Sequence, residues 1–124
     1  MANSNIVNVS AIYGTTTYVA LSTTSATTLL SNAASSGKVF KVDDIVVSNV
    51  NGSTAANVTV SVNSAASGGG TAYRLAYQIS VPAGASLIVT DKSTAFYLME
   101  NQSVVITAGT ANYLEAVLSY EDIS

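Results

Sequence analysis

The chemistry that this sequence offers rests on seven carboxylates, because it contains neither histidine nor cysteine. Without those two residue types, Ser-His-Asp and Cys-His catalysis and nearly all zinc and redox-metal sites are excluded. Two acids held at a defined separation around a sugar-sized cleft do hydrolyse glycosidic bonds. The acids available for such a role are Asp43, Asp44, Asp91, Glu100, Glu115, Glu121 and Asp122.

The spacing of these acids argues against a shared site. Asp43 and Asp44 are neighbours in an expected strand, which would place their side chains on opposite faces. No Asp-x-Asp-x-Asp-Gly loop of the kind that holds calcium is present. We interpret the acids as solvated surface groups, and we expect no catalytic, cofactor-binding or metal-binding residue and no enzyme activity.

Two other features have a possible ligand-binding interpretation. The run Gly68-Gly69-Gly70 lacks the strand-to-helix setting and the lysine of a phosphate-binding loop, so it indicates a flexible loop or tip. Seven tyrosines with Asn and Asp nearby could stack on sugars and bond their hydroxyls. Tyr73, Tyr77 and Tyr120 alternate with apolar neighbours, however, and no tryptophan is present, which favours core or subunit packing.

The elements that carry these residues are expected to be strands, because apolar residues alternate with a period of two. Residues 72–81 are predicted to turn one face to the core, and residues 57–63 to turn their valines inward. In the last strand, Leu114, Ala116, Leu118 and Tyr120 share the inward face. Residues 38–50 are apolar on both faces, which is typical of a central strand. The apolar face of residues 72–81 comprises Tyr73, Leu75, Tyr77, Ile79 and Val81.

Turn residues separate these strands at short intervals. Turns are predicted at residues 51–53, 82–84 and 108–110, and a hairpin about Gly14 joins residues 6–13 to 16–21. Further strands are expected near residues 27–31, 86–90, 95–99 and 103–107, and no long helix is expected. The predicted fold is all-β: a single-domain β-sandwich or jelly roll of about 8–10 short antiparallel strands.

Composition excludes several classes of partner. The chain has four Lys and Arg and a net charge of −3, too few cations for the phosphate contacts of a nucleic-acid-binding protein. Ser, Thr and Asn interrupt every apolar run, so no membrane helix is expected. The first residues lack the basic and apolar regions of a signal peptide, so we expect no secretion.

Low charge is the most informative property of the chain, since only 9% of residues are charged, against about 25% in typical soluble proteins. Sheets normally protect their edges with charge, so a lightly charged β-protein suits close packing with copies of itself or with a shell. A homo-oligomer is expected, with a trimer favoured. Residues 1–22 are predicted to form an N-terminal hairpin or an arm that reaches a neighbour, and residues 23–124 the sandwich domain.

Several segments of the chain resemble small virion structural proteins of tailed bacteriophages, in particular those of phages that infect cyanobacteria. The resemblance lies in the order of strands and turns and covers most of the chain. The segments that carry it are Thr24-Ser25-Ala26-Thr27-Thr28-Leu29-Leu30, Gly37-Lys38-Val39-Phe40-Lys41-Val42-Asp43-Asp44-Ile45, Val47-Ser48-Asn49, Val81-Pro82-Ala83-Gly84-Ala85-Ser86-Leu87, Phe96-Tyr97-Leu98-Met99-Glu100-Asn101-Gln102-Ser103 and Leu118-Ser119-Tyr120-Glu121-Asp122-Ile123.

This resemblance implies a virion protein present in many copies and assembled in the host cytoplasm. The first hypothesis is a capsid decoration or cement protein whose partner is the major capsid protein. The second is a tail or fibre component, in contact with tail proteins and with host surface glycans. A bacterial adhesin or pilus-like module is a third, against which the missing signal peptide argues.

Overall fold

The computed structural model describes residues 6–124 and confirms an all-β sandwich. Two 3₁₀ turns, η1 (Ala66–Gly68) and η2 (Lys92–Thr94), are the helical segments of that range. No described segment forms a helix of the length and apolarity needed to cross a membrane. The strands are β1 (Ile12–Ala20), β2 (Thr27–Asn32), β3 (Val39–Asn49), β4 (Ala56–Asn63), β5 (Ala72–Val81), β6 (Ser86–Thr90), β7 (Phe96–Leu98), β8 (Gln102–Ala108) and β9 (Leu114–Ile123).

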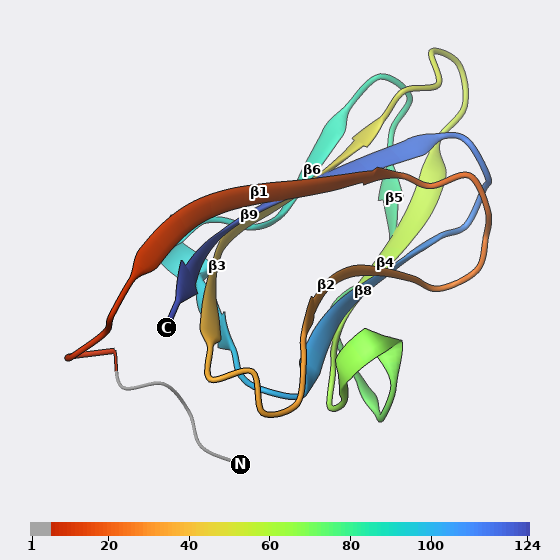
Figure 1. Ribbon diagram of the computed structural model, residues 1–124. Coiled ribbons are helices and arrows are strands. Elements are labelled where there is room, and N and C mark those ends of the chain that lie inside the picture. Colours follow the sequence, from red (N-terminus) through yellow and green to blue (C-terminus); the bar gives the residue numbers. More distant parts are fainter. Residues whose placement is uncertain (1–5) are drawn as a thin grey trace.

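The strands form two antiparallel sheets that face each other (Figure 1). Sheet A has the order β1-β9-β3-β6, with β7 pairing with β3 beside β6. Sheet B has the order β2-β8-β4-β5. Strands at opposite ends of the chain are therefore neighbours, since β1 pairs with β9 and β2 pairs with β8.

The core lies between the inward faces of the two sheets. Alternation predicts this face correctly for β4 and β9, whose valines and leucines are buried there. Val42 and Ile45 of β3 are buried there as well, although no single face was predicted for that strand. The central position expected for residues 38–50 is confirmed, since β3 lies between β9 on one side and β6 and β7 on the other.

Strand β5 departs from the predicted pattern. Its predicted core residues Tyr73, Leu75, Tyr77 and Ile79 are exposed, and of that set Val81 alone is buried. The ladder between β4 and β5 contains two register shifts, and Gln78 has a φ of 49°. Each shift displaces the alternation of side chains between the two faces, so a strict two-residue pattern does not hold along this edge strand.

The N-terminal residues contribute to sheet A. β1 runs without interruption through Gly14, where the sequence suggested a turn, and pairs with β9 along its whole length. Residues 1–5 of the expected arm lie outside the described residues. The division of the chain into residues 1–22 and 23–124 stays a prediction.

Candidate functional site

The seven acids do not gather at one place. The orientation of Asp43 and Asp44 differs from the expectation. Val42 and Ile45 both point into the core, although they are three positions apart, because the register with β9 shifts between Val42 and Asp44. A bulge of this kind leaves the two residues between them on the outer side of the sheet. The prediction that Asp43 and Asp44 face opposite sides is therefore wrong.

Other acids support the backbone or pair with lysine. Glu100 is buried and accepts a hydrogen bond of 2.6 Å from the backbone N–H of Gly37, which fixes the turn between β2 and β3. Asp122 accepts a hydrogen bond of 3.2 Å from Lys38 Nζ. Glu121 lies 3.9 Å from Lys41 Nζ on the outer face of sheet A. Glu115 is exposed on β9.

Asp91 caps the 3₁₀ turn η2. Its Oδ1 accepts hydrogen bonds from the Ser93 hydroxyl at 2.6 Å and from the Ser93 backbone N–H at 3.0 Å. These bonds, with the hydroxyl bond the larger effect, hold the pKa of the Asp91 carboxyl below its ordinary value of 3.8. Asp91 thus serves as the cap of this 3₁₀ turn.

Within residues 6–124 no three acidic side chains gather into a group that would hold a metal ion. The expectations of no catalytic, cofactor-binding or metal-binding residue, and of no enzyme activity, stay predictions.

The glycine run is part of an anchored loop and not a free tip. The loop containing η1 covers the outer face of sheet B, where Gly68 donates a backbone hydrogen bond of 2.9 Å to Ser103 Oγ. Ser103 Oγ donates in turn to Ala65 O at 2.8 Å, and Asn63 Nδ2 donates to Gly68 O at 3.0 Å. These bonds explain why the outward-facing Asn63 and Ser103 are buried.

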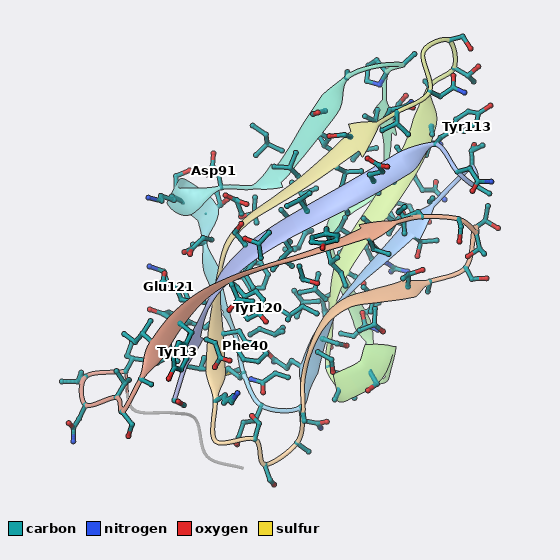
Figure 2. The ribbon with its side chains drawn as sticks, turned by 45° about the horizontal axis from the view of Figure 1, so that its top comes forward. Tyr13, Phe40, Asp91, Tyr113, Tyr120 and Glu121 are labelled. Carbon is teal, nitrogen blue, oxygen red and sulfur yellow. The ribbon has the colours of Figure 1, made fainter. Side chains whose placement is uncertain are left out.

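The tyrosines divide into two that pack against the core, Tyr113 and Tyr120, and five that are exposed. Figure 2 shows Tyr120 beside Phe40, with Tyr13 nearby on β1. The rings of Tyr120 and Phe40 are 5.0 Å apart, and Tyr120 packs against the core as predicted. Tyr73 and Tyr77 are exposed and so do not pack in the core, while the alternative of subunit packing stays a prediction. Arg74 lies 5.2 Å from the Tyr77 ring.

The outer face of sheet A carries a row of apolar side chains from four of its five strands. Three of these side chains are exposed, while the fourth, Val46, is half-buried. Tyr18 of β1 pairs with Val117 of β9, Val117 with Val46 of β3, and Val46 with Ile88 of β6. Tyr18 is 76% exposed, Ile88 62% and Val117 42%. We call these four residues the apolar row. A hollow of about 250 Å³ at its β1 end is lined by residues 18–20 and 115–117.

Small polar side chains border the apolar row. On one side Ser48 and Ser86 bond each other at 2.8 Å across β3 and β6. On the other side Thr16 and Ser119 bond at 3.2 Å across β1 and β9. Hydroxyl groups that bond each other need few new partners when the face is covered, so the row is suited to contact with another surface.

Sheet B has a polar hollow on its surface, although Tyr73, Leu75, Tyr77 and Ile79 of its edge strand β5 are exposed as well. The hollow, of about 130 Å³, is lined by Asn57, Thr59, Gln78, Thr107, Ala108 and Gly109. The Gln78 backbone N–H donates to Thr59 Oγ1 at 3.0 Å.

Sequence reasoning did not find the apolar row. Each of its residues alternates with core residues in its own strand, so it looked like the solvent face of a half-buried sheet. Only the pairing of β1, β9, β3 and β6 places the four side chains side by side. The apolar residues on both faces of β3 were the one signal that pointed toward it.

No protein-family model matches this chain, and neither does any curated protein. Solved structures do resemble it. A chain from the Bacillus endospore appendages, a novel family of disulfide-linked pili, superposes with a TM-score of 0.53 at 14% identity, covering 100% of this chain and 91% of the other. A chain from the acid-stable capsid of Helicobacter pylori bacteriophage KHP30 gives 0.53 at 13% identity, covering 94% and 90%.

The shared property is the fold. At these identities the likeness shows the β-sandwich and nothing of function. This chain contains no cysteine, so it cannot form the disulfide links that the pili are described as having.

Proposed function

We propose that this chain is a structural protein of a bacteriophage virion, most specifically a capsid decoration or cement protein. In this proposal it stabilises the head by packing the outer face of sheet A against the capsid shell. The apolar row is the observation that carries the proposal, because four apolar side chains lie in line across the sheet and three of them, Tyr18, Val117 and Ile88, are exposed in the single chain.

Energetics support this use of the face. Covering exposed apolar surface contributes about 25 cal/mol for each Å² removed from water. The hydroxyl pairs beside the row keep their mutual bonds when solvent is displaced. A chain with 9% charged residues has few charges to desolvate when it meets a partner.

The likeness to a phage capsid chain supports the proposal at the level of the fold. The nested pairing of β1 with β9 and β2 with β8 supports the jelly-roll form of the sandwich. We propose the major capsid protein as the partner, the virion as the location after assembly in the host cytoplasm, and an oligomer of this chain. The sequence alone favours a trimer, whereas the free edge of β1 described in the next subsection favours a two-fold dimer.

A rebinding experiment tests the capsid role. Purified protein added to particles that lack it should bind them and raise their melting temperature, because a ligand of the assembled shell stabilises it. Val117→Lys should weaken this rebinding by about tenfold or more, since it places a charge within the apolar row.

The matched control is Leu75→Lys on β5, because Leu75 and Val117 are both 42% exposed. Leu75 belongs to sheet B, so its substitution should leave rebinding unchanged. Absence of wild-type binding at micromolar concentration would contradict the capsid role, and equal losses in both variants would contradict the choice of face.

The alternative is a tail or fibre component that contacts host glycans, and the polar hollow on sheet B favours it. Two amide side chains and two threonines line this hollow, and such groups bond sugar hydroxyls. The exposed ring of Tyr77 belongs to the same edge strand as Gln78 and offers a surface on which a sugar could stack.

Glycan-array binding tests this alternative. Gln78→Gly should abolish binding while preserving the fold, because glycine accepts the φ of 49° at this position without a side-chain amide. An array on which the wild-type protein binds no glycan would leave the alternative without support.

A further inference from the structure

The edges of the two sheets differ in how well they are protected against pairing. Natural edge strands carry charge, proline or bulges, or are short. β5 carries Arg74 and two register shifts, β2 has one shift, and β6 spans five residues. β1 spans nine residues without a charge, a proline or a register shift. It is the one long regular edge among the described residues.

The backbone groups of β1 alternate between β9 and the free edge. Ala11 exchanges two hydrogen bonds with Ser124, of 3.1 and 3.0 Å, and Leu21 donates to Leu114 O at 2.9 Å. In an antiparallel ladder every second residue bonds the partner strand. The odd-numbered residues of β1 therefore bond β9, and Ile12, Gly14, Thr16, Tyr18 and Ala20 direct their N–H and C=O groups outward.

These five outward-directed residues define a register for a second copy of β1. A two-fold axis at Thr16, the middle residue of the strand, places Thr16 opposite Thr16 and pairs all nine residues. Gly14 then lies opposite Tyr18, and Ile12 opposite Ala20. Every hydrogen-bonded pair in this register consists of two residues that direct backbone groups outward, as antiparallel pairing requires.

The side chains are complementary in the same register. Tyr18 is 76% exposed, and it would lie across from Gly14, above which a Cβ would meet no atom within 4 Å. An aromatic ring that covers an edge glycine in this way stabilises a sheet. On the inward face Tyr13 would pair with Val19 and Thr15 with Thr17, and aromatic–β-branched and Thr–Thr pairs are both favourable.

We infer that two copies of this chain join edge to edge through β1, with a two-fold axis at Thr16. The partner is a second copy because the strand complements itself: it has no charge to repel its own copy, and its ring and its glycine are placed symmetrically about the axis. Sheet A then continues across the contact from one subunit into the other. This inference does not depend on the capsid role.

A pair of charge variants tests the contact. Light scattering of the wild-type protein at micromolar concentration should give twice the 12.6 kDa mass of the chain. Thr16→Lys and Thr16→Glu should each be monomeric, because like charges directly opposite each other raise the dissociation constant by about tenfold or more. An equimolar mixture of the two variants should recover the dimer mass, which a folding defect would not allow.

A cysteine variant tests the register. Thr16→Cys should form a disulfide-linked dimer under mild oxidation, because Cα atoms of a hydrogen-bonded pair are about 5.5 Å apart and a disulfide accepts that distance. The chain has no other cysteine to compete. The control is Ser80→Cys, because Ser80 is exposed on β5, an edge strand of the other sheet. This variant should remain monomeric on a non-reducing gel.

The outcomes separate clearly. A dimer that both charged variants disrupt and the mixture restores supports the inference. A monomeric or trimeric wild-type protein overturns it, and so does a dimer that persists in both charged variants. Circular dichroism of each variant confirms that loss of the dimer is not loss of the fold.

Discussion

The acidic residues of this chain act as caps and ion-pair partners, each within its own neighbourhood. Asp91 caps η2, Glu100 holds the backbone of Gly37, and Asp122 pairs with Lys38. The buried amide of Asn32 plays a similar part. It donates to Lys38 O at 3.0 Å and to Leu98 O at 3.1 Å, and so links the end of β2 to the residue before β3 and to the end of β7. These polar side chains hold neighbouring backbone segments in place.

The cap at Asp91 predicts a dependence of stability on pH. Its pKa in the folded state is lowered below 3.8, so folding favours the charged carboxylate. The stabilisation is present above pH 3.8 and is lost as the pH falls through the folded pKa. Asp91→Ala should therefore lower the free energy of unfolding at neutral pH, by an amount that shrinks in acid.

Urea denaturation at a series of pH values measures this difference. Asp91→Asn is the control, because its amide oxygen still accepts the bonds from Ser93 but does not titrate. A deficit of Asp91→Ala that stays constant from neutral pH into acid would show that the carboxylate charge has no part in the cap.

The residue types present in the chain predicted which kinds of chemistry are excluded. The positions of the acids in the sequence did not predict their contacts. The absence of His and Cys can be read directly from the sequence and removes whole classes of chemistry. The bulge beside Asp43 cannot be read, since nothing in Val42-Asp43-Asp44-Ile45 departs from an ordinary strand. Which acid meets which donor depends on contacts between residues far apart in the chain.

Individual elements were predicted more successfully. The strands expected at residues 57–63, 86–90 and 103–107 all form, and their bounds differ by at most one residue. The turn at residues 82–84 also forms, with Ala85 N donating to Pro82 O at 3.0 Å. The predicted core face of β5 is exposed apart from Val81, because the two register shifts arise from pairing with β4 and have no local signature in the sequence.

The turn between β5 and β6 provides a test at this scale. Gly84 has a φ of 68° and Gly52 does not have a positive φ, while an added Cβ would meet nothing within 4 Å at either position. Gly84→Ala should lower the free energy of unfolding by about 1 kcal/mol, because side chains disfavour the left-handed conformation. Gly52→Ala should be close to neutral.

Thermal or urea denaturation compares the stabilities of the two variants. Steric clashes do not bias the comparison, because the added Cβ meets no atom within 4 Å at either position. Equal stability of Gly84→Ala and Gly52→Ala would mean that the turn relaxes to another conformation when glycine is removed.

For the whole molecule, the sequence predicted the class of fold, but the arrangement of the sheets had to come from the structure. Period-two alternation and frequent turns are local properties, and they were enough to indicate a β-sandwich. The apolar row and the free edge of β1 both depend on strand order. No local pattern states that residue 18 lies beside residue 117.

The corrected core leads to a matched pair of leucine substitutions. Leu118 is fully buried between the sheets, while Leu75 lies on the exposed edge strand β5. Leu118→Ala should cost about 2–5 kcal/mol of unfolding free energy, as cavities in packed cores do. Leu75→Ala should cost less than about 1 kcal/mol, as surface substitutions do.

Denaturant midpoints of the two variants at equal protein concentration measure both costs. If Leu75→Ala proved as damaging as Leu118→Ala, the face of β5 first expected from alternation would be the buried one.

The position of β9 has a consequence for how the protein is made. β9 is the last of the described strands to be synthesised, yet it lies between β1 and β3 in sheet A. Until Leu114–Ile123 is synthesised, β1 has no strand to pair with and β3 lacks its neighbour along one edge. The pairings of β9 with β1 and β3 must therefore form late, and pairing between segments distant in the sequence is slow. Until then β1, which carries no charge, has no strand to pair with.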